Sequence, residues 1–432
     1  MVWRRTRTAF VILSTTCRPT PMNLKTSFRL QTTLAALCGF AFFVLHCPVG
    51  LRAQNVIPPQ EQAGIDKDIA RHFGDAPANP GPKAGNLSAS LDRKSVGRAI
   101  RIVGDWQLKQ SKPYFDQIWT WSVMYAGYMA VADALPEPAY RDSMREMGDK
   151  FHWELRSELP NADDQSIGQI YLEFYLRDHE AQHMAPTKAA LDRLLNGAAA
   201  KIPAGQAPIP WWWCDALFMA PPVWSRMYAS TRDARYLDYV DQHWWETSQL
   251  LYDPERHLYY RDVTFLHAKG PDGNPVFWSR GNGWVMAGIA RTLEKMPADW
   301  PNYAKYEGQL REMAKAVAKL QDPQSGLWHS NLLDAADFPQ PESSGSALMT
   351  FALAWGINHG VLDRSTYQPV VARAWRGLLG EIYADGRLGN IQQTGAAPAQ
   401  YLPSSSYTYG VGGFLLAGSE VIKLSDRPKH NH

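Results

Sequence analysis

A short turn motif occurs three times in the second half of the chain, each time after an amphipathic stretch. It reads Leu251-Tyr252-Asp253-Pro254, Leu320-Gln321-Asp322-Pro323 and Ile382-Tyr383-Ala384-Asp385. Its aspartates lie 69 and 63 residues apart. This period is about the length of two helices and two loops, which is typical of helical hairpins stacked side by side.

The rest of the chain also carries helical periodicity. Met144, Met147 and Phe151 follow helical spacing, as do Leu310, Met313, Val317 and Leu320. No run of alternating β-branched residues separates the helical stretches, which argues against a βα architecture. About five to six hairpins of this period fit the chain. We therefore predict an all-α fold, an (α/α)6 barrel with a funnel-shaped site at one end. An open solenoid is the alternative.

Composition narrows the class of ligand. The formal net charge is +2, so no field favours nucleic acid or a membrane surface. There are 17 Trp and 19 Tyr residues, a surplus of flat amphipathic surface that suits a sugar. The histidines show no metal-ligand spacing. We expect no cofactor and no metal, and we leave the oligomeric state open.

Asp215 is the first candidate catalytic residue. It follows Trp211, Trp212 and Trp213 and precedes an apolar run that includes Met219. A carboxylate against apolar surface tends to keep its proton, because desolvation disfavours the charged form. A protonated carboxyl at neutral pH is a general acid. The alternative is a helix-capping aspartate beside a tryptophan-rich core.

Two adjacent carboxylates, Asp163 and Asp164, precede the apolar stretch that begins at Ile170. They either cap a helix or supply a second carboxylate that faces Asp215.

Further along, Trp278 and Trp284 flank Arg280 in a glycine-rich segment. A planar guanidinium between two indoles suits an acidic sugar, whereas an arginine stacked on tryptophan in a structural turn is the alternative.

Two weaker candidates complete the site. Ser344 lies in a small-residue segment that leads into an apolar helix, where it either contacts a ligand or allows close packing. His329 follows Leu327-Trp328 and is the one histidine that we single out.

Together these segments resemble the unsaturated glycuronyl hydrolases. The similarity is greatest to the unsaturated rhamnogalacturonyl hydrolases of the glycoside hydrolase 105 type, which are related to the 88 type. The similarity extends from about Asp116 to Ile422. Its most specific parts are three segments, Trp213-Cys214-Asp215-Ala216-Leu217-Phe218-Met219, Trp278-Ser279-Arg280-Gly281-Asn282-Gly283-Trp284 and Glu342-Ser343-Ser344-Gly345.

The resemblance implies an (α/α)6 barrel and a substrate with a C4=C5 double bond in its terminal uronate. Asp215 would protonate C4 and then act as base toward the water that adds at C5. The hemiketal opens and expels the next sugar. Asp164 would be the second carboxylate, with Asp163 as the register alternative. Where some members carry a histidine, this chain has Arg261.

The resemblance also places Trp278, Arg280 and Trp284 at substrate-contacting positions, and the other candidates complete the predicted substrate-binding set. We predict that it comprises Trp213, Met219, Trp278, Arg280, Trp284, Ser344, His329 and Asp163. Three other functions remain open: an inverting (α/α)6 glycosidase on acidic oligosaccharides, a polysaccharide lyase, and a non-catalytic sugar-binding protein.

The N-terminus resembles an export signal. Lys25 and Arg29 precede an apolar stretch from about Leu34 to Leu45, which is short for a membrane span. We assign residues 1–53 to this signal, with Met22 as the expected start, 54–95 to a linker or surface arm, and 96–432 to the catalytic domain. We expect a periplasmic or extracellular protein without stable membrane insertion. Removing the leader leaves Cys214 as the remaining cysteine, so no internal disulfide forms.

Overall fold

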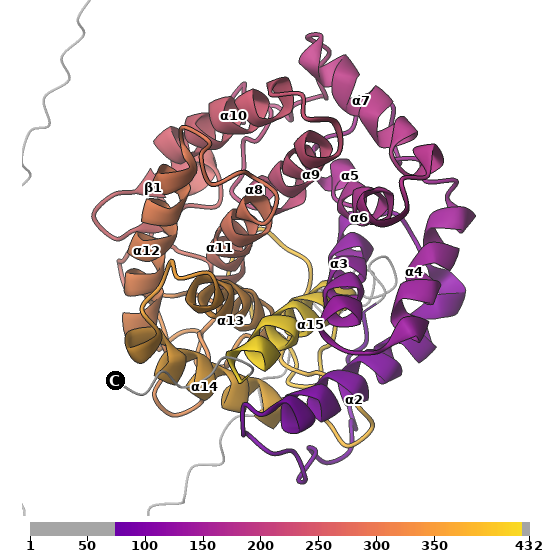
Figure 1. Cartoon of the computed structure of the whole chain (residues 1–432). Helices are drawn as coiled ribbons and strands as arrows, with labels where there is room; N and C mark the ends of the chain where they lie inside the picture. The colour runs from indigo at the N-terminus through magenta and orange to yellow at the C-terminus, as the bar shows by residue number, and fades with distance from the viewer. Residues whose placement is uncertain (1–73, 426–432) are drawn as a thin grey trace, which may run out of the picture. The chain divides into compact units, whose positions relative to one another are not determined.

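The computed structural model describes residues 74–425, and within them the helices form two concentric rings (Figure 1). The inner ring comprises α3 (Trp119–Ala134), α6 (Gly168–Asp178), α9 (Pro221–Thr231), α11 (Ser279–Leu293), α13 (Ser343–Asn358) and α15 (Thr408–Val421). The outer ring comprises α2 (Arg93–Ser111), α4 (Pro138–Lys150), α7 (Ala185–Leu195), α10 (Arg235–Leu251), α12 (Tyr303–Lys319) and α14 (Arg364–Gly380).

The inner ring is closed. Each inner helix packs on the next one, and α15 packs on α3. The predicted (α/α)6 barrel is therefore confirmed, and the open solenoid is excluded. The signal predicted for residues 1–53 lies outside the described residues, as does the first part of the predicted arm.

Burial explains why two rings form. Every residue of α11, α13 and α15 is buried, because these helices have neighbours on all sides. An outer helix such as α12 buries one face, with Tyr306, Leu310, Met313 and Val317 turned inward. That stripe is what an amphipathic surface helix presents to a core. No helix of the described residues is long and apolar enough to span a membrane.

Glycines allow the inner helices to approach one another closely. A Cβ added at Gly412 of α15 would lie 2.4 Å from the carbonyl oxygen of Val123 in α3. A Cβ at Gly288 of α11 would lie 2.2 Å from the Leu217 carbonyl oxygen, in the short helix α8 (Ala216–Met219). Such distances leave no room for any side chain, so the ring depends on glycine at these crossings.

The repeated aspartate turn follows three successive outer helices. After α10, the Asp253 carboxylate accepts the Glu255 and Arg256 amides in the hairpin of β1 (Tyr252–Asp253) and β2 (Leu258–Tyr259). After α12, the Asp322 carboxylate accepts the Ser325 amide. After α14, the Asp385 carboxylate accepts the Arg387 amide. The predicted repeat is thus confirmed as one capped turn that leads from an outer helix toward an inner one.

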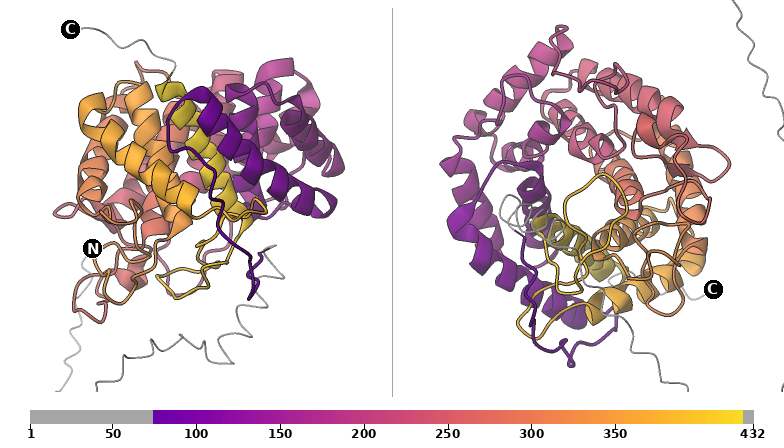
Figure 2. Two further views of the ribbon diagram at one scale, coloured as in Figure 1. Left: turned by 90° about the horizontal axis from the view of Figure 1, so that it is seen from below. Right: turned by 180° about the vertical axis from the view of Figure 1, so that it is seen from behind.

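The long loops gather at one end of the barrel, where every inner helix begins (Figure 2). These loops hold the short elements η3 (Val263–Phe265) and α8, and α5 (Ala162–Gln165) lies near them. An arm of residues 74–92 precedes α2 and pairs with the last loops through Asp75 and Ser406, and through Lys83 and Tyr383. Three further short helices are η1 (Lys112–Tyr114), η2 (Ala181–His183) and η4 (Ile422–Leu424).

A buried ion cluster joins three inner helices, at the middle of α6 and α9 and near the end of α11. Glu173 of α6 accepts from Arg226 of α9 at 2.7 Å and from Arg291 of α11 at 2.8 Å. Glu294, which follows α11, also pairs with both arginines. Burial would raise the pKa of Glu173, but Arg291 and Arg226 outweigh it and lower that pKa to about 2.

Candidate active site

Asp215 lies directly before α8, yet it does not cap that helix. Its side chain makes no capping hydrogen bond, although it occupies the N-cap position. The residue is 8% exposed, and its carboxylate lies 3.7 Å from Nε of Arg261. Burial raises its pKa, while Arg261 and Arg280 oppose that rise. The capping alternative is therefore not observed, and the carboxylate is available for chemistry.

The side chain that couples to Asp215 belongs to Asp163. Burial, Asp215 and then Asp164 raise the pKa of Asp163 to about 7, and Arg261 opposes them. Burial also raises the pKa of Asp164, but the charge that acts on Asp164 is that of Arg156. Asn161 caps α5 by accepting the Asp164 amide, so neither aspartate serves as the cap. Of the two register alternatives, Asp163 lines the same cavity as Arg261, and Asp164 is not among the lining residues.

A backbone hydrogen bond ties the Asp215 segment to the hairpin loop. The Cys214 amide donates to the Arg261 carbonyl at 2.9 Å. The buried Cys214 thiol lies 3.4 Å from the Asp215 carboxylate. Burial, and then the Asp215 charge, raise the pKa of this thiol well above its ordinary value, so it stays protonated and can donate.

A cavity of about 320 Å³ opens beside these groups. Asp163 and Arg261 line it, together with the three consecutive tryptophans and the loop of residues 198–203. Trp212 is the partly exposed indole of the three, whereas Trp211 and Trp213 are buried. The cavity therefore combines an indole face, the Asp163 carboxyl and a guanidinium, which is a suitable lining for an acidic sugar, and Asp215 adjoins the lining residues Trp213 and Arg261.

Arg280 is placed differently from its prediction. It is fully buried, and its terminal nitrogens donate to the main-chain carbonyls of Gln392 and Gln393, each at 2.8 Å. Its guanidinium also stacks on Trp278 and Tyr409. These bonds leave the Nε of Arg280 without a hydrogen-bond partner, and the uronate-binding role of Arg280 stays a prediction. The structural alternative, an arginine stacked on tryptophan, fits what is observed.

Two other residues predicted to contact the substrate lie in the protein core. Trp284 is fully buried against Trp119 and Phe218, and Met219 is 1% exposed, so neither offers a surface to a sugar. Both side chains fill the core of this structure, and their substrate contacts stay predictions.

Three further predicted residues also have protein partners. The buried Trp278 donates to the Gln392 side chain, and the buried Ser344 donates to Glu342. His329 is half-buried and pairs through its backbone with Pro341.

Sequence reasoning did not single out two candidate residues. Arg261 appeared as a departure from the family pattern, although it lies closer to Asp215 than any other guanidinium for which a contact is seen. Trp119 begins inner helix α3, is half-buried, and stacks near Tyr409 at 5.2 Å. Its position at the start of an apolar helix was the signal that could have identified it.

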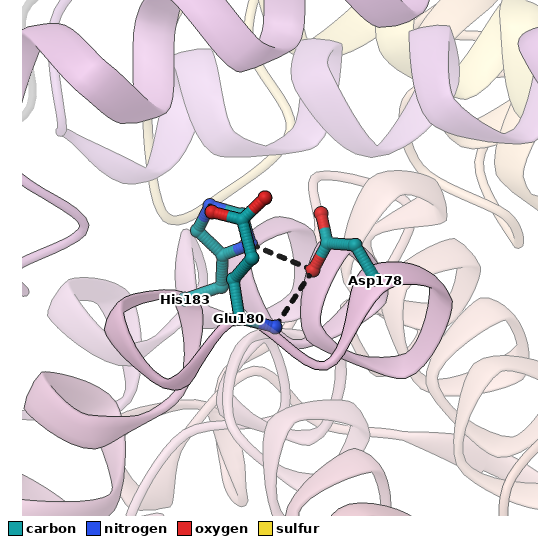
Figure 3. A group of neighbouring side chains, drawn as sticks. All are labelled: Asp178, Glu180 and His183. Carbon is teal, nitrogen blue, oxygen red and sulfur yellow. Dashed lines mark hydrogen bonds and ion pairs between the residues drawn. The ribbon is translucent and has the colours of Figure 1, made fainter.

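A second polar cluster lies after α6, near η2 (Figure 3). Within the described residues, Asp178, Glu180 and His183 are the group whose spacing could hold a metal ion. The His183 Nδ1 is 2.9 Å from Asp178, which also accepts from Arg145 at 3.1 Å and from the Glu180 amide. The guanidinium beside Asp178 opposes a second cation there, and we interpret the cluster as a stabilised helix end.

Comparison with known proteins places these features in a family. The model of Glycosyl Hydrolase Family 88 matches residues 95–425. The chain belongs to glycosyl hydrolase family 88. The predicted resemblance to unsaturated glycuronyl hydrolases is confirmed, with the 88 type as the family whose model matches, and the chain is a glycoside hydrolase.

Two curated relatives carry the name unsaturated 3S-rhamnoglycuronyl hydrolase. The protein of Formosa agariphila is 37% identical over 71% of this chain and 85% of its own. The protein of an Alteromonas species is 31% identical over 79% of this chain and 90% of its own. A family 88 hydrolase of Bacteroides vulgatus has a solved structure that is 30% identical, with a TM-score of 0.71 over 77% of this chain and 99% of its own.

Proposed function

We propose that this family 88 hydrolase cleaves oligosaccharides that end in an unsaturated uronate, by protonating and hydrating the C4=C5 enol ether. The carboxyl pair of Asp215 and Asp163 beside the indole-lined cavity is the observation that carries the proposal. The names of the two curated relatives support the same substrate class.

Asp215 delivers the proton to C4, and its carboxylate then takes a proton from the water that adds at C5. The hemiketal that forms opens and releases the neighbouring sugar. One residue suffices for both steps, so the rule that links carboxylate separation to stereochemical outcome does not apply. Burial, and then the Asp215 charge, raise the pKa of Asp163 to about 7, so Asp163 keeps a proton into the neutral range beside Asp215.

The names of the relatives also indicate which sugar follows the unsaturated uronate. We infer that the sugar after the uronate is a rhamnose of the 3S type named for those relatives. The sequence of residues 1–53 resembles an export signal, so we infer that the enzyme acts in the periplasm or outside the cell.

The test follows ultraviolet absorbance of the conjugated enol ether during incubation with lyase-generated oligosaccharides. The hydrolase consumes this absorbance, and a lyase creates it. Asp215→Asn retains shape but has no proton to give, so it should lose at least about 10²-fold in turnover. A wild-type protein that leaves the absorbance unchanged, or an Asp215→Asn variant with more than a tenth of wild-type turnover, would refute the proposal.

A further inference from the structure

The two oxygens of the Asp215 carboxyl have different surroundings. The Cys214 thiol lies 3.4 Å from Oδ2, and the Nε of Arg261 lies 3.7 Å from the same oxygen. Both groups carry a hydrogen that they can donate, and the longer distance is that of an ion pair. Among residues 74–425, no side-chain hydrogen bond to Oδ1 is seen, and the side chain of Asp215 keeps 11% of its surface exposed. The protein therefore holds Oδ2 and leaves Oδ1 for a substrate.

The thiol is fixed in place by its neighbours. Cys214 is fully buried, and its amide donates to the Arg261 carbonyl at 2.9 Å. Gly281 of α11 lies against the sulfur, because a Cβ added there would lie 3.1 Å from Sγ and 3.3 Å from the Trp278 ring. The glycine thus makes room for the sulfur. Burial, and then the Asp215 charge, raise the pKa of the thiol, so it keeps the proton that it donates.

This asymmetry decides which oxygen carries the acidic proton. A protonated carboxyl has one hydroxyl oxygen, which donates, and one carbonyl oxygen, which accepts. An oxygen that faces two donors is the accepting one, so the proton of Asp215 stands on Oδ1. In the first step the Oδ1–H bond breaks, and the π electrons of the enol ether form the C4–H bond. In the second step water adds to C5 and gives a proton back to Oδ1.

We propose that Cys214 is a positioning residue for the hydration reaction: its thiol holds Oδ2 of Asp215, so that Oδ1 both gives and takes the proton. The inference rests on the proposed function and deepens it. Cys214 acts through Asp215 and is not itself a catalytic group. The proposal gives a role to the buried cysteine that directly precedes the candidate acid.

The test measures kcat/KM against pH, from the loss of enol-ether absorbance. Cys214→Ala removes a donor that stabilises the charged form of Asp215, so the pKa of Asp215 should rise. The alkaline limb should then move to higher pH by about half a unit. The rate below that limb should fall by at least about threefold, because the carboxyl is no longer held in one orientation.

Cys214→Ser is the conservative variant, because its hydroxyl keeps a donor at this position. It should leave the alkaline limb within about 0.2 pH unit of the wild-type position and restore most of the rate that Cys214→Ala loses. Recovery by the donor, and not by side-chain volume, is what distinguishes positioning from packing.

Leu217→Ala in α8 is the matched control for packing. It removes a fully buried side chain two residues after Asp215 but no donor, so it should lower stability in urea unfolding and leave the alkaline limb in place. The charged groups that face Asp215 are Asp163 of α5, Arg261 of the loop after β2 and Arg280 of α11, and none of these variants changes them. Circular dichroism of each variant checks that it is folded.

An alkaline limb that stays in place in Cys214→Ala, or a Cys214→Ser variant that behaves like Cys214→Ala, would overturn the positioning role. A shift of equal size in Leu217→Ala would also overturn it, because that result would assign the effect to packing. A wild-type enzyme that leaves the absorbance unchanged would overturn the proposed function itself. The two failures are therefore distinguishable.

Discussion

The ion cluster of Glu173, Arg226 and Arg291 should carry a large share of the barrel's stability. Its arginines are 0% and 3% exposed, so each guanidinium depends on its protein partners. Glu173→Gln keeps the shape but removes the charge that both of them share, which leaves Glu294 as the other carboxylate in the cluster. Removing one partner of a buried pair typically costs about 3–5 kcal/mol.

The pKa of Glu173 gives an independent estimate. Because the cluster lowers it from 4.5 to about 2, the folded state gains about 3 kcal/mol above pH 4.5, at 1.36 kcal/mol for each pKa unit. A lowered carboxyl pKa means that this stability is present above the unfolded value of 4.5. It is lost as the pH falls from 4.5 toward 2. Both estimates are a sizeable part of the roughly 5–15 kcal/mol that holds a domain together.

The assay is urea unfolding of wild type and Glu173→Gln, in a series from pH 7 down to pH 3.5. We expect a difference of about 3 kcal/mol at pH 7 that begins to shrink below pH 4.5. Glu307→Gln, which breaks an exposed pair with Arg311 on α12, is the matched control and should cost below about 1 kcal/mol. If Glu173→Gln costs no more than this control at pH 7, the reasoning is wrong.

Two further predictions concern the carboxyl pair and the helix crossings. Asp163→Asn removes the carboxyl whose pKa is raised to about 7 by burial and then by the Asp215 charge, so the alkaline limb of kcat/KM that the pair sets should move to lower pH. Asp164→Asn should leave that limb in place, and a reversed result would return the role to Asp164. Gly412→Ala should destabilise the fold by at least about 1–3 kcal/mol in urea unfolding, because its Cβ would overlap the Val123 carbonyl. Gly308→Ala, which meets no atom within 4 Å on α12, should be neutral or stabilising; similar values for the two variants would contradict the crossing argument.

The barrel could be predicted because its signals are local. An aspartate turn that recurs after amphipathic stretches appears in the sequence as it appears in the structure, as at Asp253 and Asp322. The candidate role of Asp215 was visible for a similar reason, since its apolar neighbours adjoin it in the chain. Closure of the ring followed from length and period together.

The details of the site depend on contacts that sequence spacing does not record. Asp163 and Asp164 are adjacent on one helical turn, so their side chains point in different directions, and the turn's orientation decides which one meets Asp215. Arg280 is occupied by carbonyls of Gln392 and Gln393, more than a hundred residues away. The position of Arg261 beside Asp215 likewise depends on how its loop packs against Cys214.

The most direct test of the account compares a matched pair of oligosaccharides that differ only in the terminal C4=C5 double bond. The measurement is the release of the sugar next to the uronate, by the wild-type enzyme, from the unsaturated and the saturated form. Hydration of an enol ether requires the double bond, so the account predicts release from the unsaturated form and none from the saturated one. Comparable release from both would mean direct attack at the anomeric carbon, and it would contradict the role assigned to Asp215.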